Sequence, residues 1–179
     1  MFSRRFEKTV VLFLLVIVLF LPVSISAEEG AAPAAPLETL YIVPFLNVMI
    51  PEDFSALMFD QFVDQMIAVG EARDFSVRIL KQELDSVDPE WLGSQHYISG
   101  ELFAYLEESG CCSTSIEAKA RLYRHQPGLD EPADIILIED DSFFDHDLGN
   151  LDQERTIMAT RMAETLVDRL QSKMEEKLF

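Results

Sequence analysis

Apolar and polar positions change their spacing several times along the chain, and each change predicts a new element. Residues 40–45 (LYIVPF) form a short apolar run typical of a buried strand, with Pro44 near its end because proline cannot donate a ladder hydrogen bond. Pro51 and the two acids after it suit the first turn of a helix, and Gly70 is a suitable stop. The apolar stripe of this helix predicts a core face rather than a ligand groove: Phe54, Leu57, Met58, Phe62, Met66 and Val69.

Alternation becomes the dominant pattern in the middle of the chain. A short strand is expected over residues 75–80 and a short helical turn over 85–95. Residues 97–106 and 113–124 then alternate apolar with polar side chains. This period of two predicts half-buried antiparallel strands, joined across residues 107–112.

The last third of the chain predicts one more strand and one more helix. Residues 135–138 are continuously apolar, and an acidic segment follows over residues 139–147. A helix is expected from Gly149 and Asn150 onward, with acids in its first turn. Its apolar face comprises Met158, Ala159, Met162, Ala163, Leu166, Leu170 and Met174.

Together these elements predict an α/β (α+β) fold in the order β-α-β-(α)-β-β-β-α. A strand, a helix and a second strand in succession require a parallel pair with a right-handed crossover. The two alternating strands that follow are antiparallel. We therefore expect a two-layer sandwich with a mixed five-stranded sheet and helices packed on one face.

The first 27 residues have the three-part layout of a secretory signal peptide. The basic residues Arg4, Arg5 and Lys8 precede twelve apolar residues over 10–21. That run is shorter than the roughly 20 residues that span a bilayer. Cleavage is expected after Ala27, which predicts a periplasmic or secreted protein; an uncleaved amino-terminal membrane anchor is the alternative.

The residues after the predicted cleavage site change character at once. Residues 28–37 are rich in alanine and proline and predict a flexible linker. Residues 38–179 are long enough for a single α/β domain with its own core. No cysteine lies near the end of the apolar run, so the signal for an acylated bacterial lipoprotein is missing.

The charge of the chain excludes one large class of partner. The sequence has 14 basic and 32 acidic residues, a net charge of −18. Loss of the signal peptide removes three bases and one acid, which leaves a net charge of about −20. Nucleic acid and anionic lipid surfaces repel such a chain, so we expect neither nucleic-acid binding nor membrane insertion of the mature protein.

The two cysteines, Cys111 and Cys112, are adjacent. A small scaffold that depends on disulfides uses several separated cysteines, so the core must hold this fold. The pair can close a strained disulfide ring, link to other chains, or remain as thiols in a turn. A redox Cys-x-x-Cys motif is missing, which makes a redox or metal role the weaker interpretation.

Several segments together resemble a group of bacterial envelope proteins. These are YIVPF (41–45), HYISGEL (96–102), the alternating SIEAKARLYR (115–124) and the carboxy-terminal helix after an acidic stretch. The pattern is similar to the curli-secretion-channel (CsgG-like) lipoproteins and the amino-terminal domain of TolB, with Ile98, Ser99 and Gly100 matching a "visG" strand pattern. The resemblance implies a non-enzymatic envelope module that binds other envelope proteins or oligomerises.

Two departures limit what carries over from that group. Its members are usually anchored through an acylated cysteine, which this chain lacks. Its channel-forming members also carry long amphipathic segments that become a membrane barrel, and no such insertion is visible here. Outer-membrane attachment and pore formation are therefore not expected.

The acidic segment contains the weak candidates for a metal site, which are Asp141, Asp145, His146 and Asp147, with Asp140 just before them. A hard cation such as Ca²⁺ requires several oxygen ligands around a turn, and the spacing does not match an EF-hand. A solvated acidic loop that leads into a helix is the favoured interpretation. No cofactor is expected.

Motifs for catalysis are missing from the sequence. It has no Gly-x-Ser-x-Gly, no phosphate-binding glycine loop and no cysteine with a suitably placed base. We name no catalytic residue and expect a protein that is not an enzyme. A small hydrolase with scattered catalytic residues is a remote alternative.

Aromatic side chains on the long strands mark a candidate partner surface. By alternation, Phe103 and Tyr105 are expected on the same face as Tyr123, away from the helices. The alternative is that residues 127–132 or the short helix around Trp91 cover these rings.

The favoured function is a module for protein–protein binding or for envelope assembly and transport, which docks through this face and its edge strand. The alternative is an acidic cation-binding or small-ligand carrier protein.

Overall fold

The computed structural model describes residues 37–82 and 84–176. The predicted signal peptide and all but the last residue of the predicted linker lie outside these ranges. The apolar side chains of the described residues gather in one hydrophobic core. Across the two described ranges, no helix combines the length and the apolar character that a membrane crossing requires.

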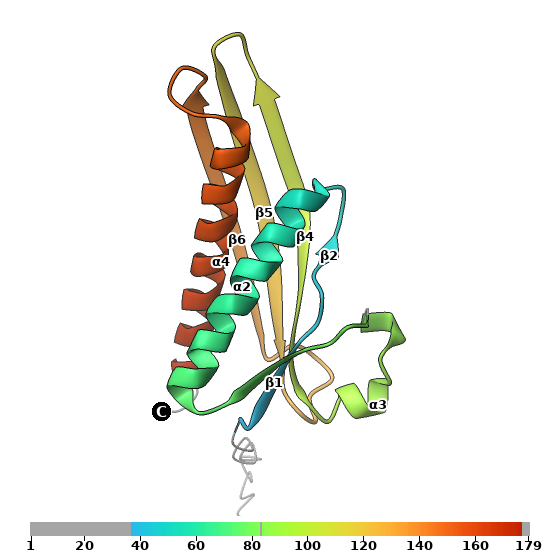
Figure 1. The fold of residues 1–179 in the computed structure, drawn as a ribbon. Helices are drawn as coiled ribbons and strands as arrows, with labels where there is room; N and C mark the ends of the chain where they lie inside the picture. The colour runs from blue at the N-terminus through green and yellow to red at the C-terminus, as the bar shows by residue number, and fades with distance from the viewer. Residues whose placement is uncertain (1–36, 83, 177–179) are drawn as a thin grey trace, which may run out of the picture. The chain divides into compact units, whose positions relative to one another are not determined.

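The helices and strands follow the predicted order with one added strand (Figure 1). Their bounds are β1 (Thr39–Ile42), β2 (Leu46–Asn47), α2 (Glu52–Arg73), β3 (Ser76–Ile79), a 3-10 turn (Leu84–Ser86), α3 (Pro89–Leu92), β4 (His96–Ser109), β5 (Ser113–His125), β6 (Asp134–Asp145) and α4 (Leu151–Glu176). The fold is α+β, as predicted.

Within the described residues, six strands form one mixed sheet in the order β3-β1-β4-β5-β6, with β2 paired to β4. The pairs β1–β3, β1–β4 and β2–β4 are parallel, and β4–β5 and β5–β6 are antiparallel. The added strand arises where Pro44 interrupts the first ladder. Ile42 pairs with Ile98, and pairing with β4 resumes at Leu46.

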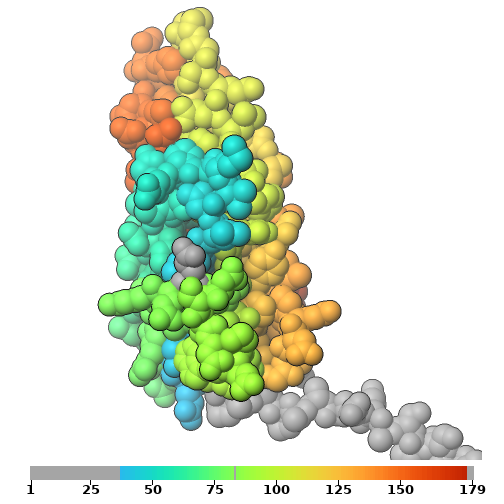
Figure 2. Space-filling view, turned by 90° about the vertical axis from the view of Figure 1, so that its right-hand side faces the viewer, coloured from blue at the N-terminus to red at the C-terminus, as the bar shows by residue number. Residues whose placement is uncertain are grey.

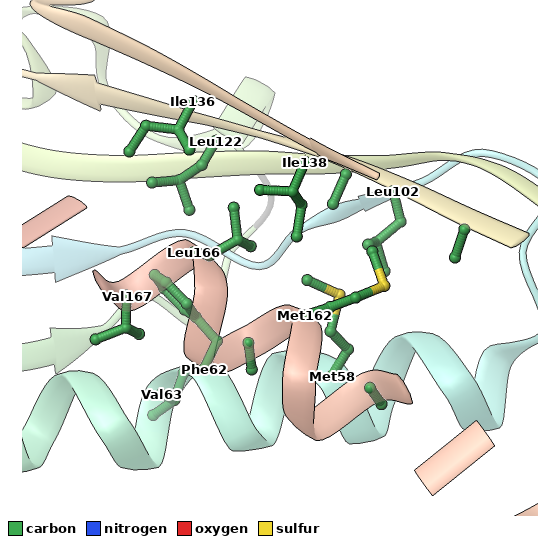
Figure 3. Close-up of a cluster of buried hydrophobic side chains, with 14 of the residues drawn as sticks. Met58, Phe62, Val63, Leu102, Leu122, Ile136, Ile138, Met162, Leu166 and Val167 are labelled. Carbon is green, nitrogen blue, oxygen red and sulfur yellow. The ribbon is translucent and has the colours of Figure 1, made fainter. Parts of the chain in front are cut away.

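Helices α2 and α4 lie side by side across one face of the sheet (Figure 1). The apolar side chains of both helices, methionines among them, point toward the sheet (Figure 3). The labelled contact residues are Met58, Phe62 and Val63 from α2, Met162, Leu166 and Val167 from α4, and Leu102, Leu122, Ile136 and Ile138 from the sheet. Each is buried, so the predicted stripes are core faces.

The short helix α3 lies on the opposite face. Because β1 sits between β3 and β4, the second crossover runs back across the sheet, and a right-handed connection then requires the face opposite α2. The Trp91 ring of α3 lies 5.0 Å from that of Tyr41, centroid to centroid. Tyr41 alternates with the buried Leu40 and Ile42, so α3 covers the part of this face above β1.

Helix α2 continues past the predicted stop at Gly70 and ends at Arg73. Asp74 then takes the left-handed conformation, with φ 62° and ψ 43°, and its N–H donates to the Gly70 carbonyl. A Cβ at Gly70 would lie 2.7 Å from the Phe75 carbonyl oxygen. The glycine therefore permits close packing of the chain that leads into β3, rather than a helix end.

Strand β6 is three times as long as the predicted 135–138 run and includes most of the acidic segment. It pairs with β5 along its whole length, from Arg124 opposite Asp134 to Ser113 opposite Asp145. The ammonium of Lys119 on β5 lies 3.2 Å from a carboxylate oxygen of Glu139. Cross-strand pairing thus holds acidic residues in a strand that their composition alone does not predict.

Gly100 in the Ile98-Ser99-Gly100 pattern makes room for an aromatic ring. A Cβ there would lie 2.8 Å from two ring carbons of Phe45 and 3.2 Å from the Arg121 carbonyl oxygen. The Phe45 ring is in turn packed against the rings of Phe59 and Phe62, each with centroids 5.2 Å away. Glycine is required at this position because any side chain would displace that cluster.

We predict that Gly100→Ala lowers the free energy of unfolding by about 1–3 kcal/mol through overpacking against Phe45. Gly110→Ala is the matched control, because its new Cβ would meet the Ser113 carbonyl oxygen at 3.5 Å, an ordinary contact. The control should change stability by less than about 0.5 kcal/mol. Urea denaturation of both variants measures the difference, and equal stabilities would show that Phe45 is not confined as described.

Candidate binding surface

The sheet face turned away from α2 and α4 carries exposed apolar side chains on β4 and β6. Leu106 is 51% exposed, Ile135 59%, Leu137 53% and Phe143 72%. The β6 residues among them alternate with buried ones, as Ile136 does between Ile135 and Leu137. We call the face formed by these four residues and the polar residues paired with them the open face.

Ion pairs and acidic side chains fill the space between the apolar groups of the open face. Lys119 lies 3.1 Å from Glu117 and 3.2 Å from Glu139, and Arg121 lies 3.0 Å from Glu101. Asp141 follows Glu139 on the same face of β6, opposite Glu117. Carboxylates therefore outnumber the basic groups around the exposed apolar side chains.

Two arginines of α4 occupy the free edge of β6. Arg169 donates from Nη1 to the Leu137 carbonyl oxygen at 2.7 Å, and Arg161 donates from Nη2 to the Asp141 carbonyl oxygen at 2.8 Å. Arg161 also holds both carboxylate oxygens of Asp140, at 2.6 and 2.8 Å. These contacts cap outward carbonyls that a further strand would need. The middle of the edge is protected, so the face offers the accessible surface.

A bulge in β4 changes the predicted aromatic patch. Leu102 and Ala104 pair with consecutive residues of β5, so Phe103 is an extra residue in the strand. Beyond it the faces exchange, and Tyr105 points to the helix side, with its ring centroid 5.3 Å from that of Phe54. The prediction that Tyr105 shares the open face with Phe103 is wrong, because alternation holds only in a strand without a bulge.

Phe103 and Tyr123 remain on the open face but are partly covered by polar neighbours. The Arg121 guanidinium lies 5.0 Å from the centroid of the Phe103 ring. The Tyr123 hydroxyl donates to Glu101 at 3.0 Å and accepts from Arg121 Nη1 at 3.1 Å. This last hydrogen bond is the main reason that the pKa of Arg121 is raised. The four side chains form a cross-strand network rather than a bare aromatic patch.

His125 and Tyr97 lie at the end of the same face, next to β1. Their rings are stacked, with centroids 4.1 Å apart and an interplanar angle of 3°. Burial disfavours the charged imidazole and lowers the pKa of His125, and burial raises the pKa of Tyr97. The Ser99 hydroxyl lies 3.5 Å from His125 Nε2.

The residues proposed as cation ligands do not converge. Asp145 accepts a hydrogen bond from the backbone N–H of Asp147 at 2.9 Å, and His146 Nε2 lies 2.9 Å from the Thr114 hydroxyl. Asp141 lies on the open face of β6, further along the strand. Among the described residues, no group of three or more His, Cys, Asp or Glu side chains is arranged to hold a metal. The acidic run is a strand followed by a turn, not a ligand loop.

Cys111 and Cys112 form the exposed turn between β4 and β5, with their sulfur atoms 3.2 Å apart. The turn lies beside the chain that follows β6, since the backbone N–H of His146 donates to the Cys112 carbonyl at 2.9 Å. Figure 2 shows this hairpin tip in yellow next to the orange end of β6. Both cysteines are thiols in this structure.

The sequence alone did not identify the apolar side chains of β6 as a candidate surface. Residues 135–138 are all apolar, which is typical of a strand covered on both faces. In the structure β6 is an edge strand with helices on one face only, so Ile135 and Leu137 are exposed. The adjacent Phe143 and Phe144 within the acidic segment were the available signal, because aromatic residues are enriched in strands and two such rings are unusual in a solvated acidic loop.

Comparisons with known proteins relate the chain to others by fold. No family model matches it, and no curated protein matches its sequence. The structure is similar to a neuraminyllactose-binding hemagglutinin homolog from Helicobacter pylori, with 11% identity, a TM-score of 0.50, and coverage of 83% of this chain and 94% of that one. At this identity the likeness shows a shared fold alone.

Other solved structures of bacterial proteins give lower scores. Lipoprotein GNA1162 from Neisseria meningitidis is 12% identical with a TM-score of 0.47, over 75% of this chain and 99% of that one. The PelC dodecamer from Paraburkholderia phytofirmans is 14% identical with a TM-score of 0.49, over 73% and 87%. The likeness to the curli-secretion-channel lipoproteins and TolB stays a prediction.

We predict that His125 makes the protein less stable at mildly acidic pH. Its pKa in the folded state lies below the unfolded value of about 6.5, so its contribution is present above that pH and is lost as the pH falls through the folded pKa. His125→Phe keeps a ring against Tyr97 and removes the titration. Between about pH 8 and pH 5 the variant should lose less unfolding free energy than the wild type in urea titrations. Equal losses would contradict the assignment.

Proposed function

We propose that this chain is an exported, non-enzymatic module of the bacterial cell envelope that binds another envelope protein through its open face. The secretory layout of residues 1–27 supports export. The sequence has no Gly-x-Ser-x-Gly motif and no phosphate-binding glycine loop, and the proposal therefore assigns the chain a binding role.

The observation that carries the proposal is the exposure of large apolar side chains on the sheet face opposite the two long helices. Full burial of such a side chain is worth about 1.5–3 kcal/mol, and these four leave 51–72% of their surface in water, so each forgoes roughly half of that amount or somewhat more. The buried neighbours Ile136 and Ile138 show that the chain places apolar side chains in the core where helices cover them. An exposed apolar face bordered by charged groups is typical of a surface that binds a partner.

The charge of the open face defines the chemistry of its partner. Exposed Ile135, Leu137 and Phe143 require an apolar counterpart, while the carboxylates around them, such as Glu139 and Asp141, favour basic side chains at its rim. A second copy of this chain would bring two acidic surfaces together, at a net charge of about −20 for each mature chain. A different protein with a basic, apolar surface fits the open face better.

We predict that Leu137→Ser with Phe143→Ser weakens partner binding at least tenfold, equivalent to about 1.4 kcal/mol, because both exposed anchors are lost. Crosslinking and pull-down from the native envelope fraction identify the partner, and titration against that purified partner measures the affinity. The free energy of unfolding of this double variant should differ from that of the wild type by less than about 0.5 kcal/mol, since both side chains face solvent in the free protein.

The matched control is Ile67→Ser with Ile157→Ser, which removes exposed apolar side chains from the helical side. This control should bind the partner as the wild type does. Equal affinities of the open-face variant and the wild type would contradict the proposal. A loss of affinity in the control alone would assign binding to the helices instead.

A further inference from the structure

We propose that Cys111 and Cys112 form a reversible thiol–disulfide exchange site, which reacts with disulfide donors and closes into a disulfide between the two adjacent residues. The evidence is the placement of the pair at the β4–β5 turn, the exposure of both side chains and the contact between their sulfur atoms. The inference does not depend on the partner proposed for the open face.

The backbone around the pair is held from two sides. The N–H of Gly110 donates to the Ser113 carbonyl at 2.8 Å, which closes the turn. The N–H of His146 donates to the Cys112 carbonyl at 2.9 Å, which ties the turn to the end of β6. The Thr114 hydroxyl lies 2.9 Å from both the Ser109 hydroxyl and His146 Nε2. The turn is therefore ordered while its thiols face solvent, where a disulfide donor has access to them.

The sulfur atoms are already in contact. Their separation of 3.2 Å has to shorten to the roughly 2.05 Å of a disulfide bond. Adjacent Cα atoms lie about 3.8 Å apart, below the usual range of about 4.4–6.8 Å for disulfides. A ring closed between neighbours is therefore strained and easily reduced, which is characteristic of regulatory rather than structural disulfides.

The reaction proceeds in two exchange steps. The thiolate of Cys111 attacks one sulfur of a donor disulfide, the donor's S–S bond breaks, and a mixed disulfide forms as the first donor thiolate leaves and takes up a proton. The Cys112 thiol then loses its proton and attacks the Cys111 sulfur. The bond between the two cysteines forms, and the second donor thiolate leaves. The pair loses two electrons and two protons, and one donor disulfide becomes two thiols.

The hydrogen bond between the thiols raises the pKa of Cys112. The same products form whichever of the two thiols attacks the donor first. The second step is intramolecular. Tethered groups act at effective concentrations of the order of mM, so at about 10 μM protein ring closure exceeds linkage to a second chain by about a hundredfold.

The test uses the reduced, purified full chain treated with glutathione disulfide. In the wild type we expect both thiols to be lost from maleimide labelling, with no glutathione retained in the intact mass and with disulfide-linked dimers below about 1%. Dithiothreitol should restore both thiols. In Cys112→Ser the second step is blocked, so one glutathione should stay bound to Cys111.

Cys112→Ser changes only an exposed side chain, so its circular dichroism spectrum should match that of the wild type. This comparison is the control for correct folding of the variant. Retention of glutathione by the wild type would show that ring closure does not occur. Disulfide-linked dimers as the main product would assign the pair to intermolecular linkage. Persistence of both thiols in the presence of the donor would show that the turn is not an exchange site. Each of these results overturns the proposal.

Discussion

The packing of α2 and α4 side by side on one face of the sheet is the constraint on which the rest of the structure depends. Met58 and Phe62 from one helix and Met162 and Leu166 from the other are fully buried against the strands. The two helices supply the cover for β4, β5 and β6 on this side only (Figure 1). The other face of these three strands is therefore free to carry side chains selected for something other than core packing.

The bulge in β4 connects this core to the start of α4. By turning Tyr105 to the helix side, it brings the tyrosine hydroxyl within 3.0 Å of Arg155 Nε, and Arg155 also donates to Glu107 at 2.8 Å. The same arginine lies 3.4 Å from Asp53 at the start of α2. One guanidinium thus joins both helices to the long hairpin. The Arg155 contacts to Tyr105 and Glu107 are partly shielded from solvent, whereas Asp53 is exposed, so the link to α4 is the stronger of the two.

Local periodicity predicted the elements that do not depend on their neighbours. The strand expected over 113–124 is observed as Ser113–His125 because strict alternation matches a strand with one covered face. Helix α4 was predicted because its apolar residues recur at the helical period of 3.6 and form one covered face. The length of β6 was not predicted, because pairing with β5 outweighs the low strand propensity of its acids.

The candidate surface was predicted only in part, because it depends on the register of one strand against another. A bulge at Phe103 reverses the face of every later residue in β4, and sequence alternation contains no sign of it. Likewise, the exposure of Leu137 follows from the position of β6 at the sheet edge, which only the topology reveals. Phe103 and Tyr123 were placed correctly because Phe103 lies at the bulge itself and β5 is regular along its length.

Cysteine accessibility on β6 tests most directly the claim that the open face is bare in the free protein and covered by a partner in the envelope. In a background with Cys111 and Cys112 replaced by serine, a single cysteine is placed at Leu137 or at the buried Ile138. In the Leu137→Cys variant we expect a maleimide to label the new cysteine rapidly in the purified protein and slowly in intact envelopes. In the Ile138→Cys variant labelling should be slow in both preparations. Equal labelling rates of Leu137→Cys in the two preparations would contradict a partner-covered open face.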